Sequence, residues 1–523
     1  MKKIKIFIIF TLCVKQLVWA SYIPPWQFPD EQAHFAQVQN FAQRGLTAFS
    51  GPNTSQEIYE SEKLLGTVRD GFGNNSFTYH PEYKLAYSDG KDGLNEDLIR
   101  NFPLRMQQKY VIFEATVYPP FYYTLLVPFY NLGRQSDLLT RIFWVRLGNI
   151  PIFLGMIFLA NRIGKVLFKS SQLVWTLTLI VSFHPMFSFV SAGTTSDNIF
   201  TLLVTLTLYV SLQTLRNGLR PRYILGMIVV LILGIYSKPQ GRLVGLIFLY
   251  PLINNLLNKS RKFQKSNWVI ISVLLVAIFG FMISNIFSGR QMLPEIPTLN
   301  DFINHDSISI QSHFLWTFWH TYHEILPWYW GVYRWLSLTY PRPIHRIINW
   351  TVLLAGFGVM ITLGKSIRNK QTLVLRSNLF FLIYASLIYF LSITFYDFIF
   401  FKTHGFSFGV QGRYFFPVIV AHMALLLVGF VSIAELLKML LRNLNIKVLG
   451  LFMIILHVYA QWYVVRSYYD ASSLKIFFNQ ASQYKPYFLK SPFLELIAIT
   501  YGMCLLILVW YYLKRVHEPY EKA

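Results

Sequence analysis

Residues 1–35 begin with MKKIKIFIIFTLCV at 1–14 and end with PPWQFPDEQAHF at 24–35, so an apolar segment is followed at once by two carboxylates and a histidine. A basic flank before an apolar core is typical of a first transmembrane helix or of a signal peptide. Because Lys15 interrupts the core and no clear small-residue cleavage site follows, we expect a retained helix over 1–21. Under either alternative the next segment lies outside the cytoplasm.

The composition of the whole chain indicates the same class of protein. Of its 523 residues, 54% are hydrophobic, 17% aromatic and only 14% charged, which is more apolar surface than a water-soluble fold can bury. The net charge of +23 does not indicate nucleic-acid binding, because the basic residues cluster in short segments between apolar runs. Cys13 and Cys504 both lie in apolar runs, which leaves neither a disulfide framework nor a cysteine metal cluster. We therefore predict an all-α integral membrane protein.

Apolar runs of about 20 residues divide the chain into about twelve transmembrane helices. The predicted spans lie near 4–21, 140–161, 172–191, 197–215, 223–238, 241–257, 268–287, 347–364, 377–397, 411–437, 447–465 and 493–513. The basic segments between them fall on one face, which the positive-inside rule assigns to the cytoplasm together with both termini. The predicted organisation is a first transmembrane helix (1–21), an external loop with an acidic motif (22–139), transmembrane helices (140–287), an external aromatic loop (288–345), transmembrane helices (346–513) and a cytoplasmic tail (514–523).

The external loop begins with the acidic motif, in FPDEQAHFAQVQNFAQ at 28–43. Pro29 and Asp30 predict a helix start, with Asp30 as the N-cap and His34 four residues later on the same side. The positive end of the helix favours the ionised form of Asp30. A carboxylate held there can take a proton from an attacking hydroxyl as a general base, or hold a divalent metal. The alternative is an ordinary solvated helix cap, and local spacing alone does not decide between them.

Two short motifs and the layout of the chain resemble a known family. PPWQFPDEQAH at 24–34 and QGRYFFP at 411–417, with a long external loop after the first span, resemble the GT-C superfamily of polyprenyl-phosphate-dependent glycosyltransferases. Within it they are most similar to bacterial membrane proteins that carry PPDE-x-x-H and QGRY-FP motifs. The resemblance covers the layout of nearly the whole chain but only these residues, and it implies a multi-pass protein of the bacterial plasma (inner) membrane.

The same resemblance implies an activity. It is that of an inverting hexosyl- or pentosyltransferase, which moves a sugar from a polyprenyl-phosphate donor to a glycan, lipid or protein acceptor at the external membrane face. Asp30 would be the general base, with Glu31 and His34 positioning the acceptor or a metal. The implied partners are the donor, the acceptor and membrane lipids, with no nucleic acid. No cofactor is certain, and a divalent metal stays open.

Two further acidic and aromatic positions bear on this resemblance. EATVYPPFYYTLLVPFYNL at 114–132 is too short to span comfortably and resembles a helix lying at the membrane interface. It carries Tyr118 where family members often have histidine, which puts the use of a metal in doubt. GTTSDN at 193–198 places Asp197 on the same external side as Asp30, and a second acidic residue in that loop is the family's usual complement. A helix cap at the start of the fourth span fits Asp197 equally well.

A departing lipid phosphate needs fixed cations, and the external face offers three. Lys238 and Arg242 lie in YSKPQGR at 236–242, and Arg413 lies between Gln411 and Tyr414 at the start of the tenth span. Cations at an external face run against the positive-inside trend, so they are better candidates for substrate binding than the cytoplasmic lysines. Snorkelling to lipid headgroups is the alternative reading of all three.

The stretch FLWTFWHTYHEILPWYWGVYRW at 314–335 is dense in aromatic residues and holds His320, His323 and Glu324. Helical spacing would align these three for a metal or for sugar hydroxyls, and aromatic faces suit sugar and prenyl packing. An aromatic belt at the membrane interface is the alternative. Sequence does not choose between them.

Two other functions remain open. An O-antigen-type polymerase or ligase also acts externally on lipid-linked sugars, but it commonly depends on arginines in a large late loop, whereas the largest loop here is early and acidic. A lipid-linked sugar transporter or flippase would place ionisable residues inside its spans near the midplane. The candidate residues here cluster at one membrane face, which favours the transferase.

Overall fold

The computed structural model describes residues 2–45, 54–70, 73–104, 115, 118–257, 310–368, 373–436 and 442–515. The predicted span at 268–287, the first part of the external aromatic loop and nearly all of the tail lie outside the described residues. The N-terminal half contains α1 (Lys2–Tyr22), α2 (Glu31–Arg44), α3 (Gln56–Leu64), α4 (Glu96–Asn101), α5 (Phe121–Leu132), α6 (Leu138–Leu147), α7 (Asn149–Leu167), α8 (Ser171–Ser182), α9 (Pro185–Val190), α10 (Asp197–Asn217), α11 (Pro221–Ile235), η3 (Pro239–Arg242) and α12 (Leu243–Leu257).

The described part of the C-terminal half is also helical, apart from one short hairpin. It contains α15 (Ile310–His320), the π-helical turn η4 (Thr321–Ile325), α16 (Leu326–Trp330), β1 (Val332–Tyr333), β2 (Leu338–Thr339), α17 (Arg342–Arg368), α18 (Leu373–His404), η6 (Gly412–Val418), α19 (Ile419–Leu436), α20 (Arg442–Tyr468), α21 (Leu474–Ser482), η7 (Tyr487–Leu489) and α22 (Phe493–Arg515). The two strands pair antiparallel, with Val332 opposite Thr339.

Eight helical segments of the described chain are long and apolar enough to cross a membrane. They are Ile4–Tyr22, Leu138–Leu167, Asp197–Asn217, Arg342–Ser366, Ser377–His404, Gly412–Leu436, Ile446–Tyr468 and Phe493–Lys514. The predicted spans near 223–238 and 241–257 correspond to the shorter helices α11 and α12, of 15 residues each. The prediction of an all-α membrane protein is confirmed.

The predicted span at 172–191 is not one continuous helix. It breaks after Ser182, where α8 ends, and α9 begins at Pro185 because a proline cannot continue the preceding hydrogen-bond ladder. The break frees the carbonyl of Ser182, which accepts from the ammonium of Lys15 on α1. The same ammonium donates to Ser188 Oγ over 2.7 Å. The lysine that interrupts the first apolar segment thus satisfies backbone that the break exposes.

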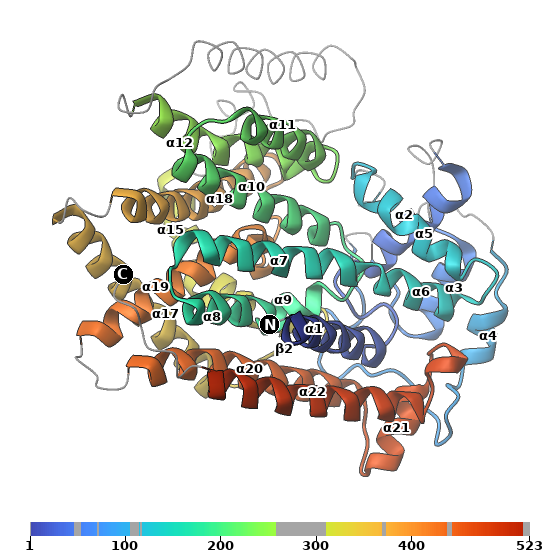
Figure 1. Ribbon diagram of the computed structural model, residues 1–523. Helices are drawn as coiled ribbons and strands as arrows, with labels where there is room; N and C mark the ends of the chain where they lie inside the picture. The colour runs from blue at the N-terminus through green and yellow to red at the C-terminus, as the bar shows by residue number, and fades with distance from the viewer. Residues whose placement is uncertain are drawn as a thin grey trace.

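One end of the helix bundle carries the segments of the long first loop. Figure 1 shows α2, α3, α4 and α5 gathered there with α21, and we call this the loop end. Distant chain segments are joined at the loop end by hydrogen bonds such as Gln483 Nε2 to the Ser88 carbonyl, 2.8 Å, and Lys485 Nζ to the Ile23 carbonyl, 2.8 Å. The described part of the first loop is therefore packed against the C-terminal segment.

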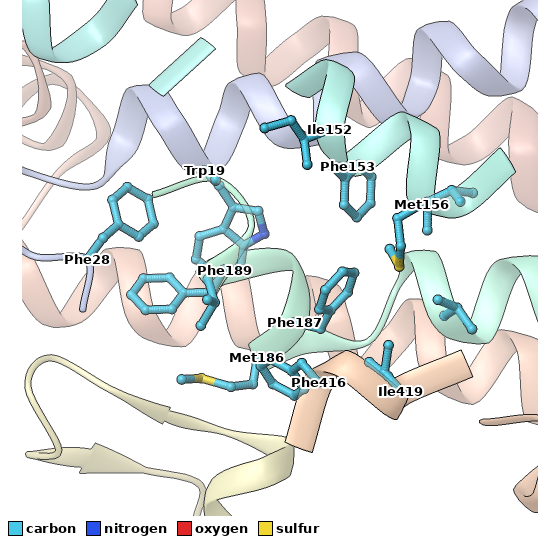
Figure 2. Packing of buried hydrophobic residues seen from close by; sticks show 14 of the residues in the cluster. Trp19, Phe28, Ile152, Phe153, Met156, Met186, Phe187, Phe189, Phe416 and Ile419 are labelled. Atoms are coloured by element: carbon cyan, nitrogen blue, oxygen red, sulfur yellow. The ribbon is translucent and has the colours of Figure 1, made fainter. Parts of the chain in front are cut away.

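Aromatic packing fixes the acidic motif to the start of α10. Phe28 lies with its ring centroid 4.9 Å from that of Phe189, and Trp19 contacts Phe189 at 5.4 Å (Figure 2). Gly193 is required at this contact, because a Cβ there would lie 2.5 Å from the Phe28 side chain. The segment before Asp30 and the loop before Asp197 consequently touch each other.

Candidate active site

A cavity of about 270 Å³ opens beside the acidic motif, and four distant parts of the chain line it. They are the motif at 27–34, the first-loop segment 69–78, the hairpin turn 332–336 and the segment 408–414, joined by Ala115, Tyr118, Met186 and Phe189. Among the predicted site residues, Asp30, His34, Tyr118, Gln411, Arg413 and Tyr414 line this cavity. Residues nearly 400 positions apart in sequence therefore share one space.

Asp30 stands immediately before α2 but does not cap it. Its backbone is in the left-handed region, with φ of 56°, and its side chain makes no hydrogen bond to the helix N-terminus. Instead one carboxylate oxygen accepts from Arg413 Nη2 over 2.7 Å, while the Asp30 side chain remains 44% exposed. The helix-cap reading of Asp30 is thus not what the geometry shows. Aspartate tolerates left-handed backbone better than most residues, which explains how this turn is accommodated.

The ionisation of Asp30 follows from its neighbours. Burial by itself raises the pKa of the Asp30 carboxyl, but the charge of Arg413 and its hydrogen bond outweigh that effect. The resulting pKa lies below the ordinary value, so Asp30 is an anion at neutral pH.

Arg413 is buried, with a side chain 5% exposed, yet its hydrogen bonds are incomplete. Nη2 donates to Asp30, whereas Nε and Nη1 have no partner among the described residues. Its guanidinium carbon lies 5.3 Å from the centre of the Tyr414 ring, which in turn stacks on Phe408. A buried guanidinium with two unpaired N–H groups beside a cavity is suited to an anionic ligand.

Lys238 and Asp197 form a second ion pair close to the first. Asp197 is the first residue of α10, and Lys238 directly precedes η3. Neither residue is part of the cavity lining, but the charges of Lys238 and Arg413 each act on both Asp30 and Asp197. The Lys238 ammonium also lies 5.8 Å from the centre of the Tyr118 ring, which lines the cavity. The two predicted carboxylates and two of the three predicted cations thus form one cluster.

His34 is held between aromatic rings at the wall of the cavity. Its ring stacks on Tyr118 and on Tyr123, with centroids 5.6 and 5.9 Å away, and Nδ1 shares a 2.8 Å hydrogen bond with the Tyr123 hydroxyl. Burial lowers the pKa of His34 to about 4, against the opposing effect of Asp30 and Asp197. The imidazole is therefore neutral at pH 7.

Glu31 lies next to Asp30 in sequence but points into the protein. It is fully buried, and its carboxylate binds Arg146 through two contacts of 2.7 Å. The carboxylate also accepts from the backbone N–H of Trp26 over 3.1 Å. The remaining N–H groups of Arg146 donate to the carbonyls of residues 20, 23 and 24. Glu31 does not line the cavity, so its predicted part in positioning an acceptor or metal has no support in the geometry.

Of the predicted group His320, His323 and Glu324, two members meet and His323 stays apart. His320 contacts Glu324 over 3.3 Å and the Val410 carbonyl over 3.2 Å, whereas the His323 ring lies against Trp319, 4.6 Å between centroids. A π-helical turn at 321–325 shifts the spacing that a regular helix would give. None of the three lines the cavity, and no three His, Cys, Asp or Glu side chains of the described chain group as metal ligands would.

Arg242, the partly exposed last residue of η3, also lies apart from the cavity. Two other arginines that the motifs did not indicate do line it, namely Arg69 and Arg334. Arg334 is the one lysine or arginine in the aromatic stretch 314–335, and this was the signal that could have pointed to it. No sequence pattern pointed to Arg69, because its position at the cavity depends on how the first loop folds.

Comparison with known proteins gives a family and a structural likeness. The family model described as "Predicted membrane protein (DUF2142)" matches residues 13–422, a range that contains both Asp30 and Arg413. No curated protein matches the chain. The crystal structure of ArnT from Cupriavidus metallidurans in the apo state is similar with a TM-score of 0.40 and 11% identity, covering 92% of this chain and 76% of that one. Since the family match spans well over half of the sequence, the chain belongs to the DUF2142 family of membrane proteins.

Proposed function

We propose that this protein is a membrane glycosyltransferase that moves a sugar from a polyprenyl-phosphate donor to a hydroxyl acceptor at the external membrane face. The observation that carries the proposal is the 2.7 Å ion pair between Asp30 and Arg413 at the wall of a cavity. It puts a proton acceptor and a phosphate-binding cation in direct contact. A sugar transfer from a lipid phosphate requires both at once.

Asp30 is suited to the role of general base. Its carboxylate is ionised, since its pKa is lowered, and it is open to the cavity rather than capping a helix. Only one of its oxygens is bound to Arg413, so the other can accept a proton. Neutral His34, on the same wall, can hydrogen-bond the acceptor without adding charge.

Arg413 is suited to hold the donor phosphate. Nη2 keeps Asp30 in place, and the unpaired Nε and Nη1 can donate to two phosphate oxygens. Lys238 adds positive charge next to this site and, through Asp197, is anchored to the end of α10. Such fixed cations stabilise the charge that develops on the departing oxygen without reorganising water.

The reaction would proceed by in-line displacement. The acceptor oxygen attacks the anomeric carbon, its proton passes to the free oxygen of Asp30, and a new glycosidic bond forms. The bond between the anomeric carbon and the phosphate oxygen breaks, and the electron pair leaves with the polyprenyl phosphate. Attack opposite the leaving group inverts the anomeric centre. Release of the proton from Asp30 to water restores the site.

A donor panel tests this proposal. Purified protein is incubated with a set of polyprenyl-phosphate hexoses and pentoses, and release of polyprenyl phosphate is followed. We expect release with at least one donor, and a fall of at least about 100-fold in Asp30→Asn. Asp97→Asn, an exposed aspartate of the same loop on α4, is the matched control and should behave as the parent. Undiminished release in Asp30→Asn would remove the base assignment, and no release with any donor would count against the transferase.

A further inference from the structure

The same cavity carries further positive charge that the proposed reaction does not use. Among the described residues, four charged side chains line the cavity, namely Asp30, Arg69, Arg334 and Arg413. Asp30 neutralises Arg413, and Glu62 neutralises Arg69 through a 2.8 Å contact with Nε. Arg334 takes part in none of the ion pairs of the described residues.

Arg334 is nevertheless almost completely buried, at 3% exposure. Its guanidinium donates to two backbone carbonyls, those of Ser467, over 2.9 Å, and Tyr83, while Nε has no partner among the described residues. It also lies 5.2 Å from the centre of the Phe77 ring. The carboxylate that acts on it, that of Glu82, is 66% exposed and bound to His80. A buried guanidinium left without a counterion is costly unless a ligand supplies one.

The backbone that presents Arg334 is itself unusual. Arg334, Trp335 and Leu336 are consecutive residues with φ of 50°, 51° and 63°. This is the left-handed region of backbone conformation, which residues other than glycine rarely adopt. The turn is held by the Trp335 indole, which donates to the Trp26 carbonyl over 3.0 Å, and by the Tyr79 N–H, which donates to the Trp335 carbonyl over 3.1 Å. Strain that is held in place in this way is found where a side chain must be presented to a ligand.

Arg69 lies on the same side of the cavity. Its backbone pairs with that of Asn75, two residues before Phe77, on which Arg334 rests. Although Nε is bound to Glu62, Nη2 is buried with no partner in the described chain. The polar side chains of Asn74 and Thr78 line the cavity beside it. Two unpaired guanidinium N–H groups and two neutral polar side chains thus belong to one wall.

We infer that this wall, which we call the Arg334 subsite and define by Arg69, Asn74, Thr78 and Arg334, binds an anionic group of the acceptor. The inference rests on the proposed function for the division between donor and acceptor. Arg413 lies at the start of the candidate membrane span Gly412–Leu436, where the phosphate of a lipid donor would reside, and the charge of Lys238 acts on the same carboxylate, Asp30. Arg334 is held by the first loop, through Tyr83 and Phe77, and by the end of α20, through Ser467. Since the proposed function already assigns the donor phosphate to Arg413, we assign Arg334 to the acceptor. The anion is a carboxylate or phosphate carried by the acceptor sugar.

Binding of small sugars to the full-length protein in detergent tests this inference without any donor. D-glucuronate and D-glucose 6-phosphate are each titrated calorimetrically against D-glucose, which shares the ring but has no charge. We expect at least one of the charged sugars to bind about tenfold more tightly than glucose at low salt, and the preference to shrink as salt rises. A preference for glucuronate alone identifies a carboxylate, and one for the phosphate alone identifies a phosphate group. Equal binding of all three sugars by the unaltered protein overturns the inference.

Four variants locate the preference. Arg334→Gln should abolish it and Arg334→Lys should keep part of it, because lysine retains the charge but not the planar fork. Arg466→Gln, an exposed arginine next to Ser467 that does not line the cavity, is the matched control and should keep the full preference. A preference that survives in Arg334→Gln but is lost in Arg413→Gln would place the anion at the donor end and contradict the inference. Since turnover is not measured, a failed transferase assay does not affect this result.

Discussion

Asp30 and Glu31 are neighbours in sequence, and each binds an arginine more than 100 residues away, but the two ion pairs are built differently. The Glu31–Arg146 pair is fully buried. All three guanidinium nitrogens of Arg146 donate, either to the Glu31 carboxylate or to backbone carbonyls. The Asp30–Arg413 pair has a carboxylate open to a cavity and an arginine with two unpaired N–H groups. A saturated pair stabilises the fold, whereas an unsaturated pair beside a cavity retains capacity for a ligand.

The largest effect is expected from breaking the saturated pair. Glu31→Gln leaves the Arg146 charge buried without its partner, so the free energy of unfolding in detergent should fall by about 3–5 kcal/mol. Glu57→Gln, which breaks the similarly buried Glu57–Arg141 pair, should also destabilise strongly. Denaturant or thermal unfolding measures both variants against the parent. If Glu31→Gln were as stable as the parent but inactive, Glu31 would belong to the reaction rather than to the scaffold.

Acid should weaken the fold near the Asp30–Arg413 pair, which we call the open pair, because His34 becomes protonated. The folded-state pKa of His34 is about 4, below its ordinary value of 6.5, so between these pH values the unfolded chain binds more protons than the folded one. Stability should therefore fall as the pH drops through 6.5 and level off below 4, by up to about 3 kcal/mol. The difference between the parent and His34→Gln isolates this residue. A pH dependence identical in both would show that His34 is not buried in its neutral form.

Changing the cation of the open pair should affect turnover more than stability. Arg413→Lys keeps one charge but cannot hold Asp30 and two phosphate oxygens at once, so we expect turnover to fall by about 100-fold. Arg242→Lys is the matched control, because Arg242 lies apart from the cavity, and its turnover should stay at the parent level. Equal losses in the two variants would mean that position relative to the cavity does not matter.

The smallest effect is expected from the carboxylate of the open pair on stability. Asp30→Asn removes a charge from a side chain that is 44% exposed, and asparagine tolerates the same left-handed backbone. The free energy of unfolding should therefore fall by clearly less than in Glu31→Gln, although the buried Arg413 loses the charge that faces it. The same unfolding assay as for Glu31→Gln gives the direct comparison. A loss as large as that of Glu31→Gln would erase the distinction between the two pairs.

Sequence patterns predicted the fold class and the main members of the cluster. Apolar runs located most of the membrane-spanning helices, and cations on the face opposite to the basic loops singled out Lys238 and Arg413. These features could be predicted because apolar length and the distribution of charge between spans can be read from each segment of the sequence separately. The break between α8 and α9 was missed, although Pro185 marks it, because the prediction of a span at 172–191 depended on the length of the apolar run.

Roles that depend on side-chain direction were not predictable. Spacing could not tell that Glu31 turns into the protein while Asp30 turns to the cavity, since a single left-handed residue separates the two directions. The π-helical turn at 321–325 changes the alignment of His320 and His323 in the same way. Arg334 and Arg69 reach the cavity only through contacts between distant segments, which no local pattern encodes.

The contact between Asp30 and Arg413 joins residues 383 positions apart, and this distance has a consequence for biogenesis. At about 5–20 residues per second, a ribosome needs roughly 20 to 80 s between adding the first partner and adding the second. During that interval the aspartate has already left the exit tunnel without its arginine, and the cavity lacks one of its walls. The contact can therefore form only after about four fifths of the polypeptide has been synthesised, and a chain that stalls or is truncated before residue 413 lacks it.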